Sequence, residues 1–520
     1  MRFFTKLFKG KKQQEINNDS LFELSCSLEK NKQNFERLFD RCDDFVKRDF
    51  ILMRNRKACI YYFESIVSSE NISRFILERL MEPMDTCVIK TAEKIKNKFL
   101  PSHEVKITKN TGDLLKAIYD GDCIILIDGI AEALIVNVRT SNGRMVGSPQ
   151  IEVSAIGPQE GFVEDIHLNL ALLRKRIKTS KFKIEFSIKG CITKNTFAIM
   201  YIEGIANPEF IDELKKRIER IDTDGVIDTG HLRRFISDNK FTPFPQEILT
   251  ERPDRCVNHL LEGRVVVMMD GSPFALIYPS LFIDLIKSAD EAYMSYYMAM
   301  FLLFLRFVAF LISTFGAALY IALTVFNPGM IPTQLLITIA SSRAGVPFPA
   351  FIEAFIMEFT FEILREANIR IPKPIGPSIS IVGGLVIGQS IVQAGIVSQA
   401  MIIVVALTAI SAFAVPGYTT NPALRLIRFP FMIAASFLGM YGIISLFVVL
   451  LIHMASIRSV GVPYLSPLAP LNLKDIQNTL LHGPPSYQRY RPAFLETLNP
   501  VHTSKKTAEY TLPGNERSLI

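Results

Sequence analysis

The sequence predicts a duplicated α+β soluble region, followed by an all-α polytopic membrane domain with four to five spans and a short polar tail. Three observations lead to this prediction. Charged residues are frequent up to about Glu291, two long runs between Phe307 and Leu424 contain no charge, and two stretches of the soluble region repeat each other. A chain of 520 residues is also too long for one hydrophobic core.

These changes in composition divide the chain into five segments. We predict a basic N-terminal segment (1–34), a first soluble α+β subdomain (35–150), a second soluble α+β subdomain (151–290), a transmembrane domain (291–457) and a polar C-terminal tail (458–520). The N-terminal segment lacks the unbroken apolar stretch of a secretion signal, so the soluble subdomains are expected in the cytoplasm.

Cysteine usage and net charge narrow the class further. All seven cysteines lie in the soluble region and none forms a CxxC pair, which suits a reducing compartment better than a disulfide framework. The net charge of +7 is modest for this length and gives no case for nucleic acid as a partner.

The soluble region contains an internal repeat. The stretch GDCIILIDGIAEALI (Gly121–Ile135) matches GRVVVMMDGSPFALI (Gly263–Ile277), and each is typical of a buried strand, a tight Asp-Gly turn and a second strand. A second match, between YFESIVSSENI at Tyr62 and YIEGIANPEFI at Tyr201, has an offset of 139 residues against 142 for the first. The sequence therefore predicts two related units in tandem.

No catalytic, metal or cofactor site is predicted. Asp128 and Asp270 could be catalytic carboxylates, but Asp-Gly at a hairpin is far more often a turn. The seven histidines show no metal-ligand spacing, and neither a nucleotide-binding loop nor a nucleophile motif is present. We therefore expect a protein that is not an enzyme.

The apolar runs predict membrane spans. Phe307–Ser342 contains no charge over 36 positions, and its first 20 residues would cross about 30 Å as a helix. Pro374–Leu424 is a second uncharged run, 51 residues long, which is enough for spans near 375–392 and 398–415. Phe429–Ile452 is predicted as the last span. A further crossing through Val346–Leu364 would change the side on which the tail lies.

A helical pattern with carboxylates lies between these runs. Gly345–Pro374 contains Glu353, Glu358, Glu362 and Glu366, of which the last three share one helical face. Charged carboxylates facing lipid are costly. Two interpretations are open: an interfacial helix, or the wall of a water-filled space whose carboxylates attract cations.

The span near 375–392 is rich in glycine and amides. Gly384 and Gly388 form a GxxxG pair that lets another helix approach closely, while Gln389 and Gln393 share one face. Amides in hydrocarbon need partners from a neighbouring helix or from pore water. Two interpretations of these residues are open. They could contact another chain around a conduit, or they could pack tightly within the same chain.

Four long motifs resemble the GerA family of spore germination proteins, the A subunits of nutrient germinant receptors. The resemblance extends from about Asn34 to Leu471 in colinear order. The motifs are EGFVEDIHLNLALLRKRIK (Glu160–Lys178), ERPDR to IYP (Glu251–Pro279), PFPAFIEAFIMEFTFEILREA (Pro347–Ala367) and IPKPIGPSISIVGG to ALTAISAF (Ile371–Phe413).

The resemblance implies a multi-pass protein of the spore inner membrane, which is the cell membrane of the forespore. It implies membrane lipid, a transporter-like B subunit and a lipoprotein C subunit as partners, and a homo-oligomer that forms a nutrient-gated cation channel. The candidate ion path is Glu353, Glu358, Glu362, Gln389 and Gln393, and the candidate helix-packing residues are Gly384 and Gly388.

Three alternatives are kept. The chain could be a non-conducting scaffold that docks the B and C subunits, or the A-like relative associated with dipicolinate release, which has the same architecture. A secondary transporter is disfavoured, because such proteins repeat within the membrane domain, whereas the visible repeat here is in the soluble region.

Overall fold

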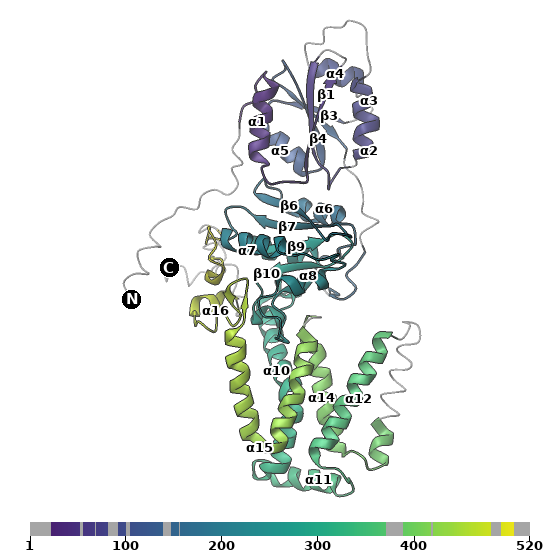
Figure 1. The fold of residues 1–520 in the computed structure, drawn as a ribbon, viewed down its shortest axis with the longest axis vertical. Helices are drawn as coiled ribbons and strands as arrows, with labels where there is room; N and C mark the ends of the chain where they lie inside the picture. The colour runs from purple at the N-terminus through teal and green to yellow at the C-terminus, as the bar shows by residue number, and fades with distance from the viewer. Residues whose placement is uncertain are drawn as a thin grey trace, which may run out of the picture.

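Three parts stacked along one axis make up the protein (Figure 1). A first soluble unit forms one end, a second soluble unit follows, and a bundle of long helices forms the other end. The computed structural model describes residues 22–52, 56–67, 69–81, 92–99, 104–138, 147–154, 156–370, 388–417, 420–479 and 490–503.

Each soluble unit is built on a five-stranded antiparallel sheet, and the two sheets have equivalent strand orders, β1-β2-β4-β5-β3 and β6-β7-β9-β10-β8. The first sheet contains β1 (Phe45–Leu52), β2 (Arg56–Phe63), β3 (Val105–Thr108), β4 (Asp122–Ile127) and β5 (Ala133–Asn137). The second contains β6 (Phe182–Lys189), β7 (Asn195–Ile202), β8 (Ile248–Thr250), β9 (Val265–Met269) and β10 (Ala275–Tyr278). The predicted α+β class of this region is confirmed.

Helices cover the faces of the sheets. In the first unit, α1 and α5 lie on one side of the sheet and α2, α3 and α4 on the other (Figure 1). Several helices are capped at the N-terminus by a polar side chain that accepts a hydrogen bond from a backbone N–H of the first turn, as Asn110 does for α5 and Asp165 for α6. The helices are α1 (Leu28–Leu38), α2 (Ser69–Asn71), α3 (Glu78–Met81), α4 (Ala92–Phe99), α5 (Thr111–Tyr119), α6 (Ile166–Arg176), α7 (Pro208–Glu219), α8 (Thr229–Ile236) and α9 (Pro253–Glu262), with a π-helical turn at Ile72–Leu77.

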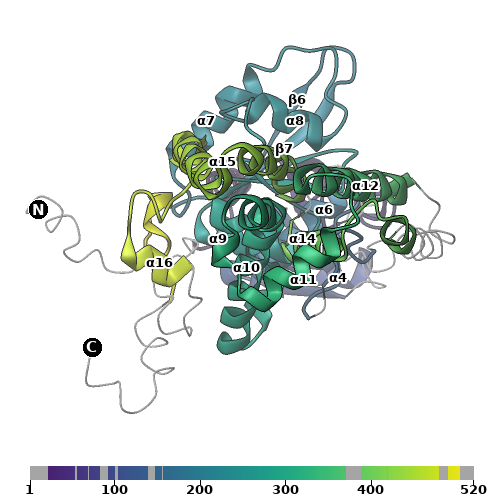
Figure 2. The ribbon, with the colours of Figure 1, turned by 90° about the horizontal axis from the view of Figure 1, so that it is seen from below.

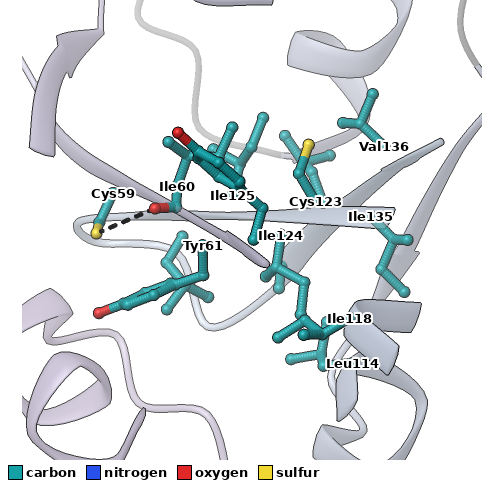
Figure 3. Close-up of a cluster of buried hydrophobic side chains, with 14 of the residues drawn as sticks. Cys59, Ile60, Tyr61, Leu114, Ile118, Cys123, Ile124, Ile125, Ile135 and Val136 are labelled. Atoms are coloured by element: carbon teal, nitrogen blue, oxygen red, sulfur yellow. Dashed lines mark hydrogen bonds between the residues drawn. The ribbon is translucent and has the colours of Figure 1, made fainter. Parts of the chain in front are cut away.

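The central strand of the first unit, β4, is apolar at every position from Cys123 to Ile127. Every residue of β4 is buried, because helices lie on both faces of the sheet. Side chains of β4 alternate between the two faces. Ile124 points toward α5, where Leu114 and Ile118 lie, and Ile125 points to the opposite face (Figure 3). A strand that is covered on both faces therefore needs apolar side chains at successive positions.

In each soluble unit, the aspartate of the Asp-Gly turn accepts a hydrogen bond from the backbone N–H at the start of a helix. Leu28 N, at the start of α1, donates to Asp128 Oδ1 at 3.1 Å, and Ile166 N, at the start of α6, donates to Asp270 Oδ1 at 3.2 Å. These are the aspartates expected at turns. The equivalent contacts give the sequence repeat a structural counterpart.

A buried ion pair joins the two soluble units. Arg174 of α6 reaches Asp44 with Nη2 at 2.7 Å from Oδ1 and Nε at 2.9 Å from Oδ2, and each side chain is 1% exposed. Arg174 Nη1 also donates to the Phe182 carbonyl oxygen at 2.8 Å. The two units therefore meet through a buried ion pair in which both the carboxylate and the guanidinium have hydrogen-bond partners.

A second buried ion pair lies where the second unit meets the helical bundle. Arg264 Nη1 is 2.6 Å from Asp284 Oδ2, and Leu281 N donates to the same oxygen at 3.0 Å. Burial alone would raise the pKa of Asp284, but Arg264 outweighs burial and holds that pKa below its usual range. Asp284 belongs to the 3₁₀ turn Phe282–Leu285, which precedes the long helices.

The helical bundle holds the apolar runs. Among the described residues, Tyr296–Phe326 and Asn421–Ser456 are long and apolar enough to cross a membrane, and Gln399–Ala414 is a shorter apolar helix. The predicted four to five spans are therefore not confirmed. The helices are α10 (Tyr296–Ile321, continued by a π-helical turn at Ala322–Phe326), α11 (Thr333–Arg343), α12 (Ala350–Arg370), α14 (Gln399–Ala414) and α15 (Thr420–Ser456). Helix α11 lies across the bundle end furthest from the soluble units (Figure 1, Figure 2).

Helix α15 folds back on itself. Gly439 within it has φ 60° and ψ −138°, far from helical values. The Phe315 ring of α10 contacts both Phe431 and Phe447, with centroids 4.7 and 5.6 Å apart. In a straight helix those two residues would be about 24 Å apart. The prediction of one last span over Phe429–Ile452 is wrong, because the backbone at Gly439 reverses the chain there.

The polar tail returns to the second soluble unit. Tyr464 Oη donates to the Pro245 carbonyl oxygen at 2.8 Å, and Arg491 Nε donates to the Leu261 carbonyl oxygen at 2.7 Å. Leu495 is fully buried in a core shared with the second sheet. The described tail elements are β11 (Arg458–Ser459), β12 (Val462–Pro463), α16 (Leu473–Thr479) and a 3₁₀ turn at Ala493–Leu495. The tail and the second unit therefore lie on the same side of the bundle.

The joint between the soluble units gives a first prediction. Asp44→Ala leaves Arg174 buried without its counter-charge, so we expect the free energy of unfolding to fall by about 3–5 kcal/mol. Glu70→Ala is the matched control, because the Glu70–Arg74 pair is exposed and such pairs contribute about 0–1 kcal/mol. Denaturant unfolding of the purified chain measures both. Equal effects of the two substitutions would contradict the assignment.

Candidate functional site

Helix α12 carries the carboxylates that the sequence singled out. Glu353 and Glu358 are fully buried, at 0% and 1% exposure, while Glu362 is half-buried and Glu366 is exposed. The helix packs against α10, α14 and α15. The two buried carboxylates therefore face protein rather than lipid or bulk water.

Glu358 lies where four helices meet. Arg428 of α15 forms an ion pair with it, and the Thr408 hydroxyl of α14 donates to its Oε1 at 2.8 Å. Arg428 Nε donates to the Ser313 carbonyl oxygen of α10 at 2.7 Å. Each of the four helices thus supplies one group to a single buried polar cluster.

Small side chains let these helices approach. A Cβ on Gly316 of α10 would lie 2.7 Å from Thr408 Cγ2, closer than such atoms normally come. Gly316 therefore permits the contact between α10 and α14 that places Thr408 beside Glu358.

Arginines also partner the other carboxylates of this helix. Glu353 Oε1 is 3.1 Å from Arg343 Nε, and its Oε2 accepts a hydrogen bond from Ser398 N at 3.0 Å. Glu362 lies 3.1 Å from Arg365 Nη1 and 3.2 Å from Arg425 Nε. We call these contacts, together with Glu358–Arg428, the α12 ion pairs.

The α12 ion pairs balance negative charge inside the bundle. Burying a lone carboxylate is costly, and a close arginine with further hydrogen bonds offsets that cost. In a single chain these carboxylates face arginines, so they could attract a cation only if the pairs separated. Arg428 Nη2 has no hydrogen-bond partner among the described residues, which leaves one donor free for water or a new acceptor.

The predicted glutamines lie apart from the carboxylates. Gln389 and Gln393 are exposed on a short helix over 388–393, and none of the described hydrogen bonds joins them to α12. A Cβ added to Gly388 would meet no atom of the described part of the chain within 4 Å. Gly384 lies outside the described residues. The structure thus brings the three glutamates together along α12 but does not bring the glutamines to them.

Sequence reasoning missed the arginines of this site. Arg343, Arg425 and Arg428 each interrupt or end an apolar run, where a charge is unexpected. The place of these arginines beside apolar runs was the signal that could have revealed them, because carboxylates in an apolar helix require positively charged partners. The pairing itself joins residues that are up to 70 positions apart.

Among the described residues, no three His, Cys, Asp or Glu side chains gather as a metal site would require.

Comparison with known proteins places these features in context. A family model described as Bacillus/Clostridium GerA spore germination protein matches residues 33–494. Spore germination protein KA of Bacillus subtilis is 38% identical over 484 residues, covering 93% of this chain and 89% of that protein. Spore germination protein GerLA of Bacillus cereus is 37% identical, covering 88% of this chain and 93% of that protein.

The soluble units have a counterpart among solved structures. The crystal structure of the N-terminal domain of the A subunit of the Bacillus megaterium spore germinant receptor GerK3 is 32% identical. It covers 51% of this chain and 98% of that chain, with a TM-score of 0.41.

The buried pair at the centre of the bundle gives a second prediction. Glu358→Gln leaves Arg428 charged and buried, so we expect a loss of about 3–5 kcal/mol in stability. Glu366→Gln is the matched control on the same helix, because Glu366 pairs with Arg370 in an exposed position. The thermal unfolding midpoint in detergent measures both. A Glu358→Gln/Arg428→Met double variant should recover part of the loss, and no recovery would contradict direct pairing.

Proposed function

This chain belongs to the GerA family of spore germination proteins, and from that premise we propose that it is the A subunit of a nutrient germinant receptor. It acts with a transporter-like B subunit and a lipoprotein C subunit in the spore inner membrane. As an oligomer it forms a nutrient-gated cation channel, whose opening triggers germination.

The observation that supports a channel is the contrast between charged and amide side chains. The buried carboxylates of α12 find arginine partners within the chain, whereas Gln389 and Gln393 are exposed. Amides at bilayer depth need a neighbouring chain or water. We therefore assign the ion path to a boundary between subunits that the 388–393 helix lines, with the α12 ion pairs supporting the bundle behind it.

Six membrane crossings belong to this proposal. Helices α12 and α14 run parallel, because Glu353 contacts Ser398 and Glu358 contacts Thr408. The count takes α10, α12, α14 and the two halves of α15 together with the span predicted near 375–392, most of which lies outside the described residues. Helix α15 supplies two crossings, one on each side of Gly439. An even number agrees with a tail that packs on the second soluble unit, since it puts both on the same side of the membrane.

A non-conducting scaffold is the second candidate. The observation that favours it is that Glu353 and Glu358 are closed off from solvent by their partners. In that case the chain would hold the B and C subunits together without carrying ions. The A-like relative associated with dipicolinate release is distinguished by deletion in the native spore-former. Loss of response to one nutrient class identifies a receptor, and a normal response with slow dipicolinate loss identifies the relative.

Planar-bilayer recording tests conduction. The oligomer reconstituted with its partner subunits should conduct cations, and Gln389→Leu with Gln393→Leu should reduce the conductance several-fold, because water loses its hydrogen-bonding partners. Ile410→Leu is the control, as it exchanges one exposed apolar side chain of α14 for another. Absence of conductance under every nutrient condition would favour the scaffold.

Assembly gives a separate prediction. Gly388→Leu should reduce the oligomer yield on native gels, because a large side chain blocks close approach of a neighbouring helix. A Cβ at Gly388 meets none of the described residues within 4 Å, so we expect the single subunit still to fold. Gly388→Ala is the milder control. Unchanged assembly of Gly388→Leu would remove the packing role from this residue.

A further inference from the structure

A single aromatic side chain projects from the second soluble unit beside the helical bundle. Phe241 lies in the loop between α8 and β8 and is 97% exposed. Lys240 next to it is also exposed. Single exposed hydrophobic side chains are common on protein surfaces, so the meaning of Phe241 depends on what lies next to it.

The loop that carries Phe241 is held by hydrogen bonds. Asn239 N donates to Gln246 Oε1 at 3.0 Å, and Gln246 Nε2 donates to the Asn239 carbonyl oxygen at 2.6 Å. Phe241 N donates to Asn239 Oδ1 at 3.0 Å. Gln246 is itself 3% exposed. The exposure of Phe241 is therefore set by an ordered loop.

Contacts on the C-terminal side of Phe241 fix its level along the bundle. The Thr242 hydroxyl lies 3.0 Å from His453 Nε2, in the last turn of α15. Phe244 belongs to the hydrophobic core of the helical bundle. Phe241 therefore lies at the end of the bundle where the apolar helices begin, on the side of the soluble units.

We propose that Phe241 inserts into the headgroup–acyl boundary of the lipid bilayer, with Lys240 beside the lipid phosphates. Phenylalanine is among the apolar side chains that interfacial segments bury at this boundary, and a lysine nearby favours anionic lipid. The contact holds the second soluble unit against the membrane surface at a point distinct from α10 and α15. It rests on bilayer insertion of the helices, which is part of the proposed function.

Lipid is favoured over a protein partner by continuity with the proposed spans. The loop is tied to the end of α15 through Thr242 and His453, so a bilayer around α15 meets it. A second copy of the chain, or a partner subunit, is the competing occupant and is separated by the experiment below.

The chain contains no tryptophan, so one substitution creates a single fluorescent reporter. We would place full-length F241W in nanodiscs containing anionic lipid and compare quenching by brominated lipids with quenching by acrylamide. V449W, on the exposed face of α15 about one turn from His453, reports contact with lipid, and I51W, exposed on β1 of the first unit, reports bulk water. We expect the F241W indole to be quenched by bromine near the headgroups and to be protected from acrylamide relative to I51W.

Each other outcome overturns the proposal in a distinct way. Acrylamide quenching of F241W equal to that of I51W, without bromine quenching, places the side chain in water. Protection from both quenchers assigns it to a protein partner. If V449W also escapes brominated lipid, the insertion of the helices fails, and the proposal fails with it.

Discussion

The buried Glu358–Arg428 pair is the interaction on which the helical bundle depends. A charge inside an apolar bundle is tolerated only beside an opposite charge and further hydrogen bonds. Here α12 provides the acid, α15 the base, α14 a hydroxyl and α10 a backbone carbonyl. Because the four groups must meet at one place, the pair fixes how these helices lie against one another.

The same principle governs the joints between the parts. Asp44 and Arg174 connect the two soluble units, and Arg264 and Asp284 stiffen the segment that leads to α10. The tail connects α15, the last long helix, to the second unit through Tyr464. The second unit is thus attached to the first and the last of the long helices. A displacement of that unit would act on both.

The exposed amides contrast with this pattern of internal pairing. Every carboxylate of α12 has an arginine within reach, while Gln389 and Gln393 are exposed on the surface of the subunit. Under the proposed function, these open amides would meet a second copy of the chain or water. The subunit boundary is consequently where the proposed ion path belongs.

The sequence by itself determined the α+β class, the apolar runs and the family, because these rest on local pattern. Strand alternation, Asp-Gly turns and uncharged stretches are properties of neighbouring residues. It also singled out Glu353, Glu358 and Glu362 as candidates for an ion path. Only the tertiary structure decided that arginines partner these carboxylates, since Arg428 is 70 positions from Glu358. It also decided the reversal at Gly439, because one backbone angle inside an apolar run leaves no mark on hydropathy.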